Sequence, residues 1–129
     1  MEIGPGFGAL TRLLYPRFPD MQAIELDERA VDELKVNLPK LKVIHLDALN
    51  ADWSQMAADR NGRLRVIGNL PYYVTSQILF SLVDHYKAIE IGIFTMQLEV
   101  AQRVTAKPNT KDYGIPSVVF QLYTKPIMN

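Results

Sequence analysis

The amino-acid sequence predicts an α/β fold in which helices cover both faces of a doubly wound, mostly parallel sheet. Short apolar runs typical of strands alternate with segments whose apolar residues recur at helical spacing. This alternation is typical of βαβ units, because parallel neighbouring strands need a crossover connection. In addition, a glycine or a polar residue follows most of the apolar runs. Ligands of open α/β sheets bind beyond the carboxyl ends of the strands.

The strand-like runs are rich in Ile, Val and Leu, as expected for parallel strands that are covered on both faces. We expect strands at Met21 to Leu26, Leu41 to Leu46, Leu64 to Gly68 and Ala88 to Met96. A very short run, Glu2-Ile3, precedes a glycine loop and predicts a first strand that is almost absent.

Helical patterns separate these runs. Asp27 is a suitable N-cap for a helix that Pro39 ends. A second helix is predicted to begin at Thr75 or Ser76, and a third to span Leu98 to Thr105. The buried faces of the first two are expected to consist of Val31, Leu34 and Leu38, and of Val74, Ile78, Leu79, Leu82 and Val83.

The length of 129 residues predicts a single domain over residues 1–129, and 48% apolar content excludes a disordered chain. No apolar run is long enough to span a membrane, and no signal peptide is recognisable at the N-terminus. The sequence contains no cysteine, which excludes thiolate chemistry and disulfides. The 14 basic and 14 acidic residues balance, so attraction to nucleic acid would require a local patch. The abrupt ends lead us to expect the central piece of a larger protein.

Four polar residues recur at nearly equal intervals, each long enough for one βα unit. They are Glu2, Glu25, Asp47 and Asn69, and each lies at or near the end of a predicted strand. We therefore expect their side chains to line one rim of the sheet.

The glycine loop follows the first predicted strand and precedes a helix. Gly4, Gly6 and Gly8 remove side chains where the backbone turns sharply, which lets a ligand approach the main chain. Gly4, Gly6 and Ala9 also fit the G-x-G-x-x-G/A fingerprint of dinucleotide sites. A nucleotide-type ligand is the favoured interpretation, and a purely structural turn is the alternative.

Two of the rim carboxylates have the chemistry of a nucleoside site. Glu25 can accept hydrogen bonds from both ribose hydroxyls, and Asp47 can accept one from an adenine amine. The structural alternatives are an exposed acid for Glu25 and a helix N-cap for Asp47.

Asn69-Leu70-Pro71-Tyr72 is the most specific element of the sequence. Proline restricts the backbone, so the Leu70 carbonyl and the Asn69 side chain can point to one place and accept both hydrogens of a single NH2 group. Tyr72 can stack on the base that carries this amine, a contact worth about 1–3 kcal/mol. The alternative is an ordinary strand-to-helix turn that contains proline.

These motifs resemble the KsgA-type small-subunit rRNA adenine dimethyltransferases. The resemblance rests on segments in the same order along the whole chain. These are Glu2-Ile-Gly-Pro-Gly-Phe-Gly-Ala-Leu-Thr11, Glu25-Leu-Asp27, Asp47-Ala-Leu49, Asn69-Leu-Pro-Tyr-Tyr-Val-Thr-Ser76, Glu99-Val-Ala-Gln-Arg103, Ala106-Lys-Pro108, Lys111-Asp-Tyr-Gly114 and Ser117-Val118.

The resemblance implies a Rossmann-like S-adenosylmethionine-dependent methyltransferase fold, here truncated at both ends. The implied activity is methylation of N6 of two adjacent adenines near the 3′ end of small-subunit rRNA, in ribosome biogenesis. The cofactor would contact Glu2, Gly4, Gly6, Glu25, Asp47, Ala48 and Asn69. The target adenine would contact the catalytic residues Asn69, Leu70, Pro71 and Tyr72. The family's N-terminal segment and C-terminal helical domain are expected to be missing.

The family also implies a monomer that acts on the pre-ribosomal small subunit in the cytoplasm, or in an organelle if a transit peptide has been lost. No membrane partner is expected. Non-catalytic alternatives are a fragment that binds S-adenosylmethionine or RNA, and a ribosome-assembly factor. A nicotinamide enzyme shares the glycine loop and Glu25 but has no use for Asn-Leu-Pro-Tyr. No metal site is expected, because His45 and His85 are isolated.

Overall fold

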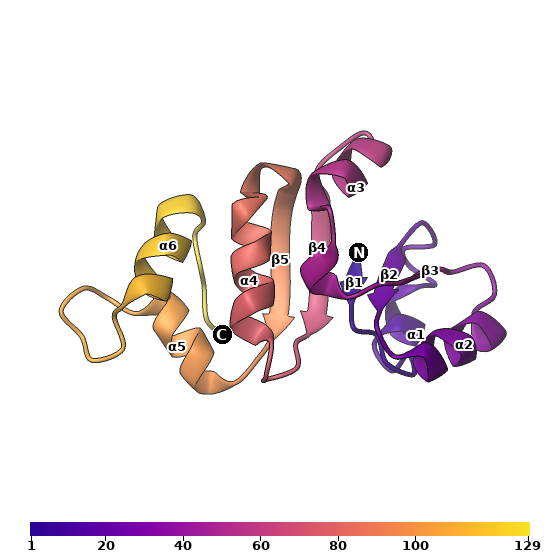
Figure 1. The fold of residues 1–129 in the computed structure, drawn as a ribbon, viewed down its shortest axis with the longest axis horizontal. Helices are drawn as coiled ribbons and strands as arrows, with labels where there is room; N and C mark the ends of the chain where they lie inside the picture. Colours follow the sequence, from indigo (N-terminus) through magenta and orange to yellow (C-terminus); the bar gives the residue numbers. More distant parts are fainter.

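The computed structural model describes all residues from 1 to 129 and contains a five-stranded sheet in the order β3-β2-β1-β4-β5. All four pairings are parallel, so the predicted α/β class is confirmed (Figure 1). The strands are β1 (Glu2–Ile3), β2 (Gln22–Glu25), β3 (Lys42–His45), β4 (Leu64–Asn69) and β5 (Ile89–Thr95). The α-helices are α1 (Thr11–Leu14), α2 (Glu28–Asn37), α3 (Trp53–Asp59), α4 (Thr75–Asp84), α5 (Leu98–Thr105) and α6 (Ile115–Tyr123). Two short 3-10 helices are η1 (Ala48–Asn50) and η2 (Tyr86–Ala88).

Strand β1 is central although it contains two residues. Glu2 pairs with Ala23 on one side and with Ile67 on the other, and both β1 residues are buried. The chain order reverses at β1, because β2 and β3 extend the sheet one way and β4 and β5 the other. Right-handed crossovers in opposite directions place helices on both faces and create a switch point beside the carboxyl end of β1.

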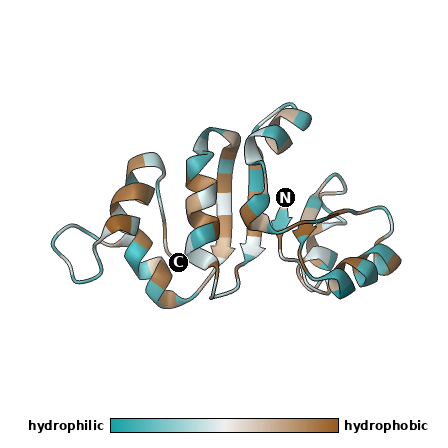
Figure 2. Cartoon of the chain, in the orientation of Figure 1, coloured by the Kyte–Doolittle hydropathy of each residue, from teal (hydrophilic) through white to brown (hydrophobic).

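The predicted helices form for the expected local reasons. The Asp27 side chain accepts a hydrogen bond from the Arg29 N–H and caps α2, whose buried face includes Val31 and Leu34. The rest of α2 is mainly hydrophilic, as Figure 2 shows. Helix α5 spans the predicted residues, and α4 begins at Thr75 as predicted.

The hydrophobic core lies between the sheet and the helices α3 and α4. Trp53 is fully buried there, and its indole N–H donates to Ser81 Oγ at 3.1 Å. Leu64 and Val66 of β4 and Leu79 of α4 belong to the same cluster of 15 buried residues. The chain leaves the carboxyl end of β4 and passes the end of β5 to enter α4, which lies beside β5 (Figure 1).

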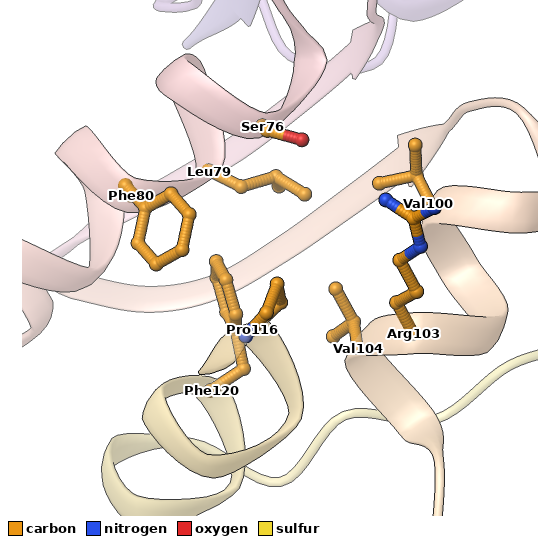
Figure 3. A pocket seen from close by; sticks show the side chains of 8 residues that line it. All are labelled: Ser76, Leu79, Phe80, Val100, Arg103, Val104, Pro116 and Phe120. Atoms are coloured by element: carbon orange, nitrogen blue, oxygen red, sulfur yellow. The ribbon is translucent and has the colours of Figure 1, made fainter. Parts of the chain in front are cut away.

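Helices α5 and α6 pack together beside α4. Ser117 Oγ donates to the carbonyl of Arg103, and Gln121 Nε2 donates to the carbonyls of Val104 and Ala106. These side chains therefore satisfy carbonyls at the end of α5 that have no partner within that helix. Figure 3 shows the small gap that remains, which is lined by Ser76, Leu79, Phe80, Val100, Arg103, Val104, Pro116 and Phe120.

Two apolar side chains of the edge strand β5 are exposed to solvent. Ile91 and Ile93 are 50% and 59% exposed and lie in register with Arg65 and Ile67 of β4. Separately, none of the helices has both the length and the apolar character that a membrane span requires.

Candidate active site

The carboxyl ends of the strands bring most of the predicted rim together. Glu25 ends β2 and pairs with His45, while Asn69 ends β4 and pairs with Thr95. Asp47 follows the end of β3 by two residues. Glu2 departs from the prediction, because its partners Ala23 and Ile67 each lie two residues before Glu25 and Asn69. The expected row of four rim groups is therefore wrong for Glu2, which lies below the edge.

Glu2 is a buried carboxyl that supports the site from beneath. Its exposed fraction is 2%, and Thr11 Oγ1 donates to Glu2 Oε1 at 2.6 Å. Burial raises the pKa of Glu2 above its usual value, and the hydrogen bond from Thr11 offsets only part of this increase. The carboxyl thus links β1 to α1 across the glycine loop.

The glycine loop has open space beside two of its three glycines. Gly4 and Gly6 adopt φ values of +66° and +56°, and a Cβ atom built on either would meet no atom within 4 Å. Gly8 has a different role, since a Cβ atom there would lie 2.9 Å from Leu34 Cδ2. The first two glycines therefore leave room for a ligand, whereas the third allows α1 and α2 to approach.

Glu25 is more than an exposed acid. Its Oε1 accepts from the Gly6 N–H at 2.8 Å, and its Oε2 accepts from the Leu26 and Asp27 N–H groups at 2.8 and 3.0 Å. A carboxylate has about four acceptor positions, so about one is left for a ligand hydroxyl. A ribose bound by Glu25 would therefore share this carboxylate with the backbone of the glycine loop.

Asp47 and Ala48 form the next part of the edge. Asp47 Oδ1 accepts from the Leu49 N–H at 3.0 Å and caps η1, so the N-cap interpretation is confirmed. The cap engages Oδ1 and leaves Oδ2 to accept from a ligand amine. Ala48 is 8% exposed and belongs to the core cluster, so its side chain supports the edge from below.

In the turn after β4, the two backbone carbonyls of Leu70 and Pro71 differ in their hydrogen bonds. The Pro71 carbonyl accepts from the Val74 N–H and from Thr75 Oγ1, at 3.2 and 2.7 Å. The Leu70 carbonyl accepts no hydrogen bond from the chain, although the Leu70 side chain is buried. The turn is thus fixed through Pro71 while the Leu70 carbonyl remains available.

Asn69 and Tyr72 flank this carbonyl in sequence. Asn69 Oδ1 accepts from Thr95 Oγ1 at 2.6 Å, and both side chains are exposed. The Tyr72 ring is 70% exposed and meets the Tyr73 ring edge-on, with centroids 5.7 Å apart. An amide oxygen, a carbonyl and an exposed aromatic ring within four residues can recognise an aromatic amine.

Three residues around the site were not identified from the sequence. Thr11, Thr75 and Thr95 each donate a hydroxyl to a predicted site residue. Thr95 had a recognisable signal, because it ends the fifth strand just as Asn69 ends the fourth. Thr11 and Thr75 are buried in the first turns of helices, where threonine carries no distinct sequence signal.

Basic residues differ in their pairing. Arg60 and Arg65 form salt bridges with Asp20 and Glu90 at 3.0 Å. Arg103, Lys107 and Lys111 form no salt bridge and lie on α5 and on the loop that follows it. These three cations therefore have no carboxylate partner within the chain that would compete with a phosphate.

Comparison with known proteins identifies the chain's relatives. A family model described as "Ribosomal RNA adenine dimethylase" matches residues 1–128. Proteins named "Ribosomal RNA small subunit methyltransferase A" from Salinibacter ruber and Acidobacterium capsulatum are both 44% identical, over 99% and 97% of this chain. The chain spans 43% and 45% of their lengths, so it corresponds to less than half of these relatives.

Two solved methyltransferase structures are similar to this chain in fold. The crystal structure of a dimethyladenosine transferase from Plasmodium falciparum has a TM-score of 0.78 and 25% identity, and covers 94% of this chain and 43% of its own. A plantazolicin methyltransferase has a TM-score of 0.55 at 14% identity and shares the fold. Because the family model matches nearly the whole chain and the relatives are up to 44% identical, this chain belongs to the ribosomal RNA adenine dimethylase family.

Proposed function

We propose that this chain carries the cofactor site and the adenine site of an S-adenosylmethionine-dependent methyltransferase that acts on N6 of adenine in small-subunit rRNA. The observation that carries the proposal is the pair of acceptors after β4, Asn69 Oδ1 and the Leu70 carbonyl. They lie at the edge where the glycine loop leaves an open approach to the backbone.

The residues at this edge fit the cofactor. Gly4 and Gly6 leave space for its amino-acid and ribose region, with the Glu2 carboxyl beneath them. The free acceptor position of Glu25 accepts from a ribose hydroxyl, and Asp47 Oδ2 accepts from the adenine amine beside Ala48. Bound S-adenosylmethionine supplies a methyl group on a positively charged sulfur.

The chain's own part in the reaction is to present the target amine. Two acceptors, Asn69 Oδ1 and the Leu70 carbonyl, would draw both N–H bonds of N6 and leave the nitrogen lone pair free to attack the methyl carbon. The bond between that carbon and the cofactor sulfur would break as the C–N bond forms, and the sulfur would leave as a neutral thioether. Tyr72 stacks on the adenine after the base has left its helical stack. Alignment and exclusion of water, more than a strong base, would provide the rate enhancement. The proton of the methylated amine would pass to the solvent after the transfer.

The substrate assignment rests on the family and on charge placement. The relatives are named as small-subunit rRNA methyltransferases, and two adjacent adenines near the 3′ end are the proposed targets. Arg103, Lys107 and Lys111 carry no salt bridge and are proposed to contact the RNA backbone. We extend the proposal to a monomer that acts on the pre-ribosomal small subunit in the cytoplasm.

A second candidate function is a binding module without catalysis. One observation favours it: the net charge of the sequence is zero, so no overall positive charge attracts an RNA substrate. Such a module would bind the cofactor or rRNA through the same edge without transferring a methyl group.

Methyl transfer distinguishes these functions. The protein is incubated with deuterium-labelled S-adenosylmethionine and unmodified small-subunit rRNA, and the nucleosides are analysed by mass spectrometry. We expect labelled N6-methyladenosine and N6,N6-dimethyladenosine, and a strongly reduced but measurable yield of both with Asn69→Ala. Cofactor binding without any labelled adenosine would support the binding module, and label on another atom or base would contradict the assignment of the adenine site.

A further inference from the structure

We propose that Thr95 is a positioning residue for methyl transfer, because its hydroxyl holds the Asn69 carboxamide with Oδ1 facing the target amine. The inference rests on the proposed function, and it assigns a role to a residue of β5 outside the Asn-Leu-Pro-Tyr turn. Thr95 itself is not required to touch the adenine.

The contacts place Thr95 against both acceptors. Thr95 Oγ1 donates to Asn69 Oδ1 at 2.6 Å, and the Thr95 carbonyl accepts from the Leu70 N–H at 3.0 Å. The two strands are in register here, since Asn69 and Thr95 are partners in the ladder between β4 and β5. One residue of the neighbouring strand therefore fixes the side chain of Asn69 and the backbone of Leu70.

The orientation of the carboxamide matters because its two ends have opposite roles. The carbonyl oxygen accepts hydrogen bonds, whereas the NH2 group only donates them. The terminal torsion of asparagine is broad and roughly two-fold, so the side chain can present either end. A flipped Asn69 would direct an NH2 group at the NH2 group of adenine and lose the acceptor.

A hydroxyl on β5 holds the carboxamide in place, and the 2.6 Å distance is that of an O–H···O bond, shorter than is usual for N–H···O, so it favours the oxygen end of the carboxamide at Thr95. Thr95 Oγ1 donates its hydrogen to Asn69 Oδ1, and this is the hydrogen bond that its hydroxyl makes in the chain. An amide oxygen has two lone pairs, so Oδ1 can accept from Thr95 and from adenine at the same time. Valine has the shape of threonine without a donor and would leave the carboxamide free to rotate.

Kinetics on small-subunit rRNA test this role with three single variants. We expect Thr95→Val to lower kcat about tenfold and to leave KM for rRNA within about twofold, because misplacement of a reacting group affects the chemical step. Thr95→Ser restores the hydroxyl and is expected to recover most of kcat. The control is Thr105→Val, which removes a hydroxyl that donates to Ala101 on α5, and it should keep the unaltered kcat.

A double-mutant cycle separates positioning from a general structural effect. In the Asn69→Ala background the hydroxyl of Thr95 has no carboxamide to orient, so Thr95→Val should cause no further loss. A tenfold further loss in that background would overturn the inference, as would a Thr95→Val variant with unaltered kcat.

The side-chain amide signals of Asn69 in a ¹⁵N NMR spectrum test the orientation without activity. We expect one narrow pair in the unaltered protein and in Thr95→Ser, and broadened or doubled signals in Thr95→Val. Unchanged signals in Thr95→Val would overturn the inference whatever the kinetics show. Signals that change in a protein that methylates no rRNA would support the orienting contact and overturn the proposed function, together with the role of Thr95 in catalysis.

Discussion

The Gly6 N–H donates a 2.8 Å hydrogen bond to Glu25 Oε1, which ties the glycine loop after β1 to the tip of β2. Glu25 Oε2 also accepts from the Leu26 and Asp27 N–H groups. The acid proposed to hold a ribose thus also determines the shape of the loop on which the cofactor is proposed to lie. Cofactor binding and loop geometry are therefore coupled through one carboxylate.

Substitution of Glu25 should weaken the cofactor site. We expect Glu25→Ala to reduce the affinity for S-adenosylmethionine by about 1–3 kcal/mol, because charge-assisted hydrogen bonds to the ribose are lost. Isothermal titration calorimetry measures the change, with Glu28→Ala in the first turn of α2 as a control that should bind normally. An unchanged affinity in Glu25→Ala would remove this residue from the site.

The glycines of the loop should separate into two classes. Gly8→Ala places a Cβ atom 2.9 Å from Leu34 Cδ2, so we expect it to destabilise the fold by about 1–3 kcal/mol through overpacking and strain. Gly4→Ala meets no atom within 4 Å, so backbone strain of about 1 kcal/mol remains. Its Cβ atom extends into the proposed cofactor site.

Urea denaturation and calorimetry on the two variants test this division. Gly4→Ala should lose more affinity for S-adenosylmethionine than Gly8→Ala does, although it loses less stability. The reverse order would mean that the open side of the loop is not where the cofactor lies.

The buried carboxyl of Glu2 should make stability depend on pH. Burial raises its pKa above the value of 4.5 expected in the unfolded chain, so the folded state binds its proton more tightly. The contribution of Glu2 to stability is therefore greatest below pH 4.5 and falls as the pH rises through the higher folded pKa. We expect Glu2→Gln to flatten this part of the curve of unfolding free energy against pH.

Urea titrations between about pH 4 and 7 measure the effect. The control is Glu33→Gln on the exposed side of α2, which should retain the slope of the unaltered protein. Parallel curves for Glu2→Gln and the unaltered protein would show that Glu2 does not titrate as its burial requires.

The hydroxyl of Thr75 should stabilise the turn that presents Leu70 and Asn69. Thr75 is 1% exposed, and its Oγ1 donates to the Pro71 carbonyl at 2.7 Å. We expect Thr75→Val to lower the free energy of unfolding by about 0.5–1.5 kcal/mol and to reduce methyl transfer. The exposed Thr110, which donates to the Lys107 carbonyl, provides the matched control Thr110→Val with a smaller effect on both measurements.

Tyr72 should matter for turnover and not for folding. Because its ring is 70% exposed, Tyr72→Ala should change the free energy of unfolding by less than about 0.5 kcal/mol. We expect most methyl transfer to be lost, since stacking on the flipped base is worth about 1–3 kcal/mol. Tyr123→Ala on α6 is the control, and normal methylation by Tyr72→Ala would show that the stacking role is wrong.

The sequence predicts the elements whose local signals agree with their packing. Asp27 and Thr75 begin α2 and α4 because each precedes an apolar stripe that faces the sheet. Helix α6 was not identified, since Ile115–Tyr123 is a short, largely apolar run whose period does not separate helix from strand. Tertiary contacts fix its helical form. Ser117 of α6 donates a hydrogen bond to the Arg103 carbonyl of α5, and the ring centroids of Phe120 and Phe80 lie 5.3 Å apart.

In the site, too, local sequence predicts some residues, whereas contacts between strands determine the positions of others. Asn69, Leu70 and Glu25 are found from the sequence because their residue types match the chemistry expected at strand ends. The depth of Glu2 depends on the register of β1 against β2 and β4, which the spacing of motifs does not reveal. Likewise, the sequence places Thr95 near the end of its strand, but its contact with Asn69 joins two strands and depends on their register.

The most direct test of the central claim is a calorimetric titration of the protein with S-adenosylmethionine, with NADH as the competing dinucleotide. The glycine loop and Glu25 would suit either ligand, whereas the family and the turn after β4 specify the methyl donor. We expect saturable binding of S-adenosylmethionine, weakened by Gly4→Ala, and no binding of NADH. A folded protein that ignores S-adenosylmethionine, or one that binds NADH instead, would contradict the assignment of the site.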